Sequence, residues 1–203
     1  MNTLKTLSIT TALLFGMTTA AVAQDAKAPA AGKAPAPATA AVAPKMEAPK
    51  PPVEVADMAK AMAGTWRCTG KVSPGGDASK TMEVKATIKS KLDLDKWWIS
   101  MSGTTAGKPA YKWNELTTYD ASVKKWFRIG ADNMGGSDNL TSTGATAGKI
   151  VWDGESRSAQ AGKVAKVRFT DELTTAKEFK TLHEISMDGG KTWATTLDGV
   201  CKK

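Results

Sequence analysis

Alternation of apolar and polar residues dominates the chain after Gly64. Met82, Val84, Ala86 and Ile88 are apolar, and the residues between them are charged or carry a hydroxyl group. A period of two places successive side chains on opposite faces of a strand, so this strand would have one face on a core and the other in water. The pattern predicts an antiparallel sheet rather than helices.

Ten segments of this kind follow one another, and most are separated by short turns rich in glycine and aspartate. Short turns join antiparallel neighbours, so the order in the sheet should follow the order in the chain, and closure would remove the exposed edges. We expect an all-β fold, a single antiparallel up-and-down β-barrel of about ten strands. The predicted strands are Thr65–Val72, Thr81–Leu94, Trp97–Thr105, Tyr111–Tyr119, Lys124–Ala131, Asn139–Thr143, Lys149–Asp153, Lys163–Leu173, Glu178–Met187 and Thr192–Val200.

One segment ahead of the strands has helical spacing instead. Val55, Met58, Ala59 and Met62 recur at positions i, i+3, i+4 and i+7, and Gly64 follows them. This spacing puts the four side chains on one face of a helix, and glycine commonly follows a helix end. We expect a short N-terminal helix that plugs one end of the sheet.

The first 54 residues have a different character. An apolar stretch from Leu7 to Thr18 follows Lys5 and precedes Ala21-Val22-Ala23, which is typical of a cleaved secretory signal and too short to span a bilayer. Residues 24–54 are mainly alanine, proline and lysine, and cannot bury enough apolar surface to fold. We therefore expect a signal peptide at 1–23, a disordered linker at 24–54 and one domain at 55–203. The mature protein would be periplasmic or secreted, without a transmembrane segment.

The chain has two cysteines, Cys68 in the first predicted strand and Cys201 just after the last one. An oxidising compartment permits a disulfide, which would require the two ends of the sheet to lie side by side. A sheet closed on itself meets this requirement. The alternatives are two buried thiols or a bond to another chain.

The formal net charge is +8, but the lysines are scattered among aspartate and glutamate. No basic run follows the spacing of a phosphate backbone, so nucleic acid is not an expected partner. Contact between the basic linker and the surface of the cell envelope stays open.

The triplet Gly64-Thr65-Trp66 after a short helix resembles the start of lipocalins and fatty-acid-binding proteins, the calycin barrels, in which the tryptophan closes the bottom of the barrel. With Lys149-Ile150-Val151-Trp152 and the segment from Asp188 to Trp193, the chain from about Met58 to Lys202 is similar to a bacterial group of secreted, lipocalin-like domains of unknown function. The resemblance implies a fold and no activity.

The segment Ser186 to Trp193 matches the pattern Ser-x-Asp-x-Gly-x-Thr-Trp, known as an Asp-box and familiar from sialidase propellers. In such a turn Asp188 accepts backbone N–H groups, glycines take positive φ angles, and Trp193 packs beneath the hairpin. We expect a structural role for Asp188 and no catalytic one.

Catalytic and metal-binding motifs are missing from the sequence. His183 is the only histidine, and no Gly-x-Ser-x-Gly segment presents a nucleophile. A haem ligand inside the barrel is one interpretation of His183, and a hydrogen-bonded, half-buried histidine is favoured. A glycine-rich segment interpreted as a loop carries side-chain oxygens that could bind calcium, but their spacing is not that of an EF-hand. These side chains are Asp132, Asn133, Asp138 and Asn139. We expect no catalytic residue, metal or cofactor, and therefore no enzyme.

Two strand faces suggest a ligand site. Tyr111, Trp113, Glu115, Thr117 and Tyr119 share one face of a strand, and Trp126 and Arg128 share a face of the next. If these faces point inward, they line a largely apolar cavity with a few charges to orient a polar head. The candidate ligand-binding residues are Trp113, Tyr119, Trp126, Arg128, Arg168 and His183.

The opposite orientation is the alternative, in which those faces point outward and Phe127, Ile129, Val167 and Phe169 form a solid core. Of the possible functions we favour non-enzymatic binding or transport of a small hydrophobic or amphiphilic ligand. The alternative is a structural or interaction module at the cell envelope.

Overall fold

The computed structural model describes residues 48–158 and 162–203. The expected signal peptide at 1–23, and all but the last residues of the expected linker at 24–54, lie outside these residues. The expected domain at 55–203 lies within them apart from the gap at 159–161.

Within the described residues one α-helix precedes eleven strands, with three short 3₁₀ turns at Pro74–Gly76, Ala78–Lys80 and Leu94–Lys96. The helix is α1 (Val53–Met62). The strands are β1 (Gly64–Val72), β2 (Met82–Asp93), β3 (Trp98–Thr105), β4 (Lys112–Asp120), β5 (Lys125–Asp132), β6 (Ser137–Ser142), β7 (Ala145–Thr146), β8 (Lys149–Ser158), β9 (Lys163–Thr175), β10 (Glu178–Ser186) and β11 (Ala194–Lys202).

All ten predicted strands are present, and the short β7 is added between two of them. The largest difference is in β8, which continues to Ser158 although the prediction ended it at Asp153. Gly154, the residue after the predicted end, lies inside the strand, where the backbone of Asn139 occupies the space that a Cβ atom would need. A glycine inside a strand often marks such a close backbone approach.

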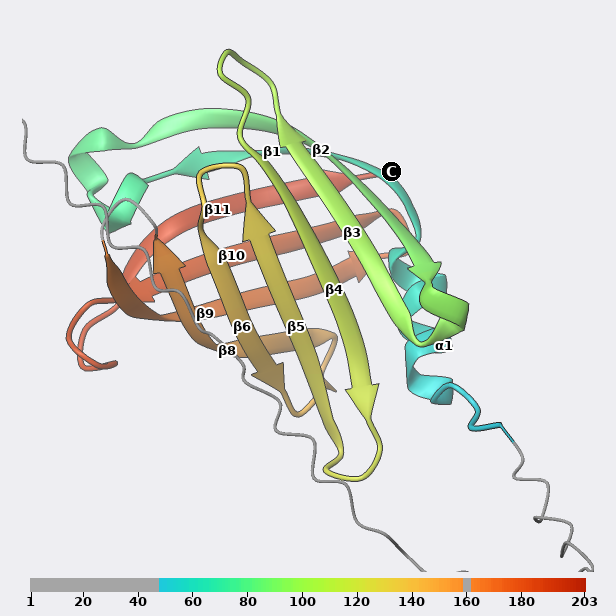
Figure 1. The fold of residues 1–203 in the computed structure, drawn as a ribbon. Coiled ribbons are helices and arrows are strands. Elements are labelled where there is room, and N and C mark those ends of the chain that lie inside the picture. Colours follow the sequence, from blue (N-terminus) through green and yellow to red (C-terminus); the bar gives the residue numbers. More distant parts are fainter. Residues whose placement is uncertain (1–47, 159–161) are drawn as a thin grey trace, which may run out of the picture. The chain divides into compact units, whose positions relative to one another are not determined.

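The strands form a closed barrel. Consecutive strands from β1 to β6 pair antiparallel with one another, and so do consecutive strands from β8 to β11. The pairs β6–β8 and β1–β11 complete the ring, while β7 pairs with β8 alone. Figure 1 shows this ring, with β4, β5 and β6 on one wall and β9, β10 and β11 on the other. The prediction of an all-β, up-and-down barrel of about ten strands with a short helix is confirmed.

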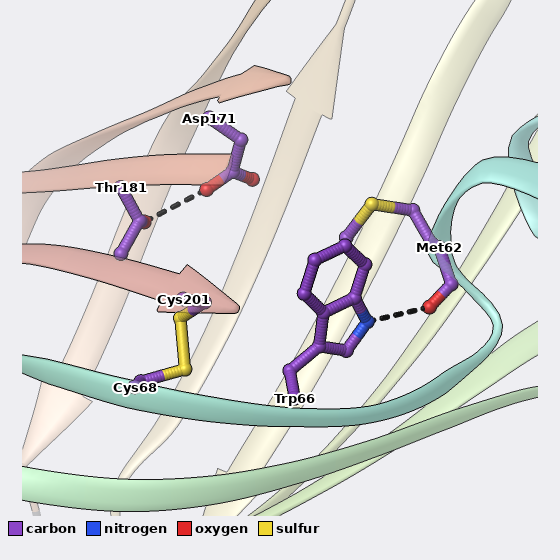
Figure 2. The surroundings of a disulfide bond; sticks show 6 residues. All are labelled: Met62, Trp66, Cys68, Asp171, Thr181 and Cys201. Carbon is purple, nitrogen blue, oxygen red and sulfur yellow. Dashed lines mark hydrogen bonds between the residues drawn. A yellow bond between two sulfur atoms is a disulfide. The ribbon is translucent and has the colours of Figure 1, made fainter. Parts of the chain in front are cut away.

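A disulfide links the first strand of the ring to the last. Cys68 and Cys201 are directly paired between β1 and β11, with their Cα atoms 4.0 Å apart. The bond faces the interior, since Cys201 is fully buried with Trp66 and Phe179. Figure 2 shows the bond beside these strands. The predicted pairing of the two cysteines is confirmed.

Helix α1 closes one end of the barrel. Val55 and Ala59 are buried against residues from several strands, among them Ile99 and Trp126. Trp66, fully buried, donates its indole N–H to the carbonyl oxygen of Met62 at 2.8 Å, as drawn in Figure 2. This is the end at which β4 and β11 finish, so the opposite end of the ring is not covered by the helix.

Removing the disulfide should cost the protein a large part of its stability. The bond joins residues 133 positions apart, and for a loop of that length chain-entropy models give about 5 kcal/mol. We expect the double variant Cys68→Ala/Cys201→Ala to unfold at a much lower guanidinium concentration than the oxidised protein, measured by circular dichroism. Equal midpoints would contradict the role assigned to the bond.

Candidate functional site

The burial of alternate residues decides which strand faces point inward. In β5, Trp126 and Arg128 are buried with 7% of each exposed, whereas Ile129 is 43% exposed. In β4, Thr117 is buried on the same face as Trp113 and Glu115. The aromatic and charged faces of β4 and β5 therefore point into the barrel, which places Trp113, Tyr119, Trp126 and Arg128 on its inner wall.

In β9 the inner face carries Val167 and Phe169, which are 4% and 9% exposed. His183 of β10 belongs to the same interior, where its ring stacks on that of Phe169 with the centroids 3.8 Å apart. The interior thus combines residues from both alternatives: the faces of Trp113 and Trp126 point inward, and so do Val167 and Phe169.

Arg168 is the one candidate residue that lies elsewhere. Because Phe169 takes the inner face, its neighbour Arg168 lies on the outer wall, where its Nε donates to Glu184 at 2.9 Å. Its guanidinium also lies over the ring of Trp193, 4.4 Å from the centroid. The inclusion of Arg168 with the inward-facing residues is wrong, and its contacts are those of an outer-surface residue.

Arg168 and Trp193 adjoin the Asp-box turn. Asp188 accepts the backbone N–H groups of Lys191 and Thr192 at 3.0 and 2.9 Å, and the hydroxyl groups of Ser186 and Thr192 also donate to it. These hydrogen bonds, led by that of the Thr192 side chain, lower the pKa of Asp188. The arrangement is that of a turn, as the sequence pattern indicated.

The end of the barrel next to α1 is filled with apolar side chains. The rings of Tyr119 and Trp126 are in contact at a tilt of 56°, with their centroids 5.2 Å apart, and both pack in the cluster that contains Val55 and Leu140. These two candidate residues serve packing between the sheet and the helix.

A buried ion pair crosses the middle of the interior. Arg128 of β5 donates to Asp171 of β9 at 2.9 Å, and its guanidinium lies 4.0 Å from the ring centroid of Trp152. The Trp152 indole N–H and the Thr181 hydroxyl donate to the same carboxylate at 3.1 and 2.8 Å. Burial alone would raise the pKa of Asp171, but Arg128, His183 and Thr181 together lower it.

Two further carboxylates lie near Arg128 without comparable partners. A carboxylate oxygen of Glu115 is 3.9 Å from the Arg128 Nε. Burial raises the pKa of Glu115 to about 7 against the opposing effect of Arg128, and Asp138 and Asp171 raise it further. Burial also raises the pKa of Asp138. Glu115 was expected on the face that lines a cavity but was not among the candidate ligand-binding residues, and Asp138 was expected in a loop, whereas it lies in β6.

The register of the strands places these groups in one row around the inner wall. Ser90 is opposite Met101, Met101 opposite Glu115, Glu115 opposite Gly130, and Gly130 opposite Asp138. A Cβ atom at Gly130 would lie 2.7 Å from the Asp138 carboxylate, so the absent side chain is what admits this carboxylate to the wall. Glu115 and Asp138 are thus separated in the row by a glycine alone.

Three buried side-chain atoms in the described ranges have no hydrogen-bond partner: Ser90 Oγ, Arg128 Nε and Asp138 Oδ1. Ser90 and Asp138 lie in the row just described, and Arg128 is one inward position from Gly130 on β5. Arg128 Nε and Asp138 Oδ1 therefore lie on strands beside Glu115, whereas Met101 separates Ser90 from Glu115 in the row. We call Ser90, Glu115, Arg128 and Asp138 the polar belt.

Two aromatic rings lie between the polar belt and the end of the barrel that α1 does not cover. Tyr111 and Trp113 stack at a centroid distance of 5.6 Å, and both are only partly buried. The Trp113 ring lies against Gly103, where any side chain would collide with it. The Tyr111 hydroxyl donates to Asp132 at 3.0 Å. Burial and then this carboxylate raise the pKa of Tyr111.

No protein-family model matches this chain, and no curated protein matches it either. The closed antiparallel barrel is compatible with a lipocalin-like, calycin-type fold. In the described parts of the chain, no helix is long and apolar enough to cross a membrane.

The ionisation of Glu115 should make stability depend on pH. Its pKa of about 7 in the folded state lies above the ordinary 4.5, so the folded protein holds an extra proton between these values. The contribution of Glu115 to stability therefore falls as pH rises through this window. At about 1.4 kcal/mol per pKa unit, Glu115→Gln should raise the free energy of unfolding by at most about 3 kcal/mol above neutral pH, and have little effect near pH ~4. Urea unfolding of the parent protein and of Glu115→Gln at pH values across this window would measure both effects.

His183 makes the stability depend on pH in the opposite sense over a similar pH range. Burial lowers its pKa from 6.5 to about 4, so its contribution is lost as pH falls. The difference in free energy of unfolding between Glu115→Gln and the parent protein does not contain this contribution at any pH, because both proteins retain His183. A variant that is less stable than the parent at pH ~8 would show that Arg128 requires the Glu115 carboxylate.

Proposed function

We propose that the protein binds or carries a small hydrophobic or amphiphilic ligand inside the barrel, between the Tyr111–Trp113 pair and the polar belt, and that it catalyses no reaction. The observation that carries this proposal is the set of three unpartnered atoms in the interior, on Ser90, Arg128 and Asp138.

Unpartnered polar atoms of this kind are costly. A buried donor or acceptor without a partner costs about 1–3 kcal/mol, and folded proteins keep few of them. A donor in the polar head of a guest molecule would serve Asp138 Oδ1, and an acceptor in the guest would serve Arg128 Nε. Binding would then recover a cost that the empty protein carries.

The Tyr111–Trp113 pair supports an apolar or aromatic part for the same ligand. The two stacked rings are partly exposed at the end of the barrel that lacks the helix. Ligand sites in proteins are mostly lined by apolar and aromatic side chains, with a few polar groups that fix orientation. The rings and the polar belt together supply these two elements.

The proposal extends to the compartment. A disulfide between Cys68 and Cys201 is consistent with an extracytoplasmic location, where such bonds persist. Together with the expected signal peptide, this supports a periplasmic or secreted protein of the bacterial lipocalin-like group.

Native mass spectrometry of protein purified from its own source, without denaturation, tests the binding proposal. We expect a small molecule that stays with the folded protein and is lost on denaturation. Trp113→Ala should reduce its occupancy severalfold because the aromatic wall of the site is removed. Trp98→Ala is the matched control, since Trp98 lies on the outer face of β3. Repeated absence of any bound molecule in the parent protein would contradict the proposal.

A second candidate function, an interaction module at the cell envelope, is supported by the outer wall. Arg67 on β1 lies opposite Thr87 of β2, between the exposed Lys85 and Lys89 on the same face, and opposite Lys202 of β11. No ion pair involves Arg67, Lys85 or Lys89 among residues 48–158 and 162–203. Like charges so placed repel each other, and an anionic surface would relieve this.

A hollow of about 660 Å³ lies beside Lys89 and Lys91. Consecutive residues of three neighbouring strands, 89–91, 100–102 and 114–116, line it, so it lies along the wall of β2, β3 and β4 and not across the interior. Co-sedimentation with cell-wall material tests this second function. The variant Lys85→Gln/Lys89→Gln should bind severalfold more weakly than the parent, and Lys125→Gln, which is exposed on β5, should not. Equal retention of all three proteins would contradict it.

A further inference from the structure

We infer that the polar head accepted by the interior site is a protonated amine, so that the ligand is a small organic cation with an apolar or aromatic tail. This inference rests on the proposed ligand-binding function and specifies its substrate class. It follows from how the charges of the interior are already paired.

The positive charge of Arg128 is already matched. Asp171 lies 2.9 Å from its Nη2 atom, and the same carboxylate accepts from Thr181 and Trp152. An anionic head group would have to compete with this hydrogen-bonded pair for the guanidinium. It would also approach Glu115 and Asp138, which carry the same sign of charge.

Once Glu115 has lost its proton, Glu115 and Asp138 are acceptors that need donors. Asp138 Oδ1 has no partner, and the described contact of the Glu115 carboxylate is Arg128 Nε at 3.9 Å, which is too long for a hydrogen bond. The two residues face the interior from β4 and β6 on either side of Gly130. An ammonium group has three N–H donors and no acceptor, so one such group can serve both carboxylates.

Ser90 supplies an independent observation. Its side chain is 5% exposed, its hydroxyl has no partner, and it lies in the same row of the inner wall as Glu115. Because Met101 lies between Ser90 and Glu115 in this row, the hydroxyl oxygen is a separate acceptor on the same wall and does not share the ammonium group with the two carboxylates. A carboxylate or phosphate head would use Ser90 as a donor but would leave Asp138 Oδ1 without a hydrogen.

The aromatic pair suits the rest of such a ligand. Trp113 is two residues from Glu115 on the inner face of β4, and Tyr111 two residues further, which spans about 13 Å at ~3.3 Å per residue. Trp and Tyr rings attract cations as well as apolar groups. Asp132, which holds the Tyr111 hydroxyl, adds another carboxylate at this end. A short tail along these rings would bring an amine to the polar belt.

Three probes that share a phenylalkyl tail and differ in head group separate the effect of charge from that of the apolar part: phenylbutylamine, phenylbutanol and phenylbutyrate. Each is titrated by calorimetry into the full-length oxidised protein. We expect the amine to bind about tenfold more tightly than the alcohol, since hydrogen bonds between charged groups are stronger than those of a neutral hydroxyl, and the carboxylate to bind most weakly. Binding of the carboxylate as tightly as the amine would overturn the inference and leave the proposed function intact. Failure of all three probes to bind would count against the proposed function itself.

Variants locate the effect. Glu115→Gln and Asp138→Asn should each weaken the amine by about tenfold and leave the alcohol within about twofold. Glu83→Gln, which removes an exposed carboxylate from β2, should change neither affinity. Unchanged alcohol binding shows that a variant is folded and its site intact. An amine affinity that is unaltered in both interior variants would overturn the inference, whatever the affinity of the parent protein.

Discussion

The pairing of the first strand with the last is the constraint on which the rest of the structure depends. Six residue pairs join β1 to β11, and the Cys68–Cys201 bond fixes one of them covalently. Once the ring is closed, every strand has an inside and an outside, and the alternation along the chain acquires a physical meaning. The burial of Arg128 and the exposure of Ile129, its neighbour, are both consequences of this closure.

The guanidinium of Arg128 then separates an apolar part of the interior from a polar part. On the side of α1, apolar residues such as Val55, Trp126 and Leu140 pack as an ordinary core. Around Arg128 the interior becomes polar, because a buried cation requires partners. Asp171 on the opposite wall is one of them. The other members of the polar belt, Ser90, Glu115 and Asp138, offer more hydrogen-bond acceptors than donors. This imbalance is unfavourable for stability, and such compromises are typical of sites that bind something.

The sequence predicted the strands, the helix, the closure and the disulfide, because each has a local signal: a period of two, a period near 3.6, short turns, and one cysteine near each end. It could not decide which face of each strand points inward, since alternation defines two faces without ranking them. Arg168 was grouped with the interior for that reason, although Phe169 beside it is the buried residue.

The members of the polar belt were harder to predict. Asp138 follows a glycine-rich segment whose composition is typical of a loop. Only the register with β5 shows that Gly130 makes room for Asp138 on the inner wall. Asp171 lies 43 residues from Arg128, and no pattern within either strand reveals that they meet. Contacts across a barrel depend on shear and closure, which are properties of the whole sheet.

Closure between β1 and β11 also has a kinetic consequence. Most pairings in the barrel are between neighbours in the chain and can form early as hairpins, whereas β1 and β11 are separated by nearly the whole domain. Contacts of such long range slow folding, since the entropy of joining distant segments is lost before the contact is gained. Because Cys68 and Cys201 are directly paired across this seam, alignment of β1 with β11 brings the two thiols into the position that a disulfide requires.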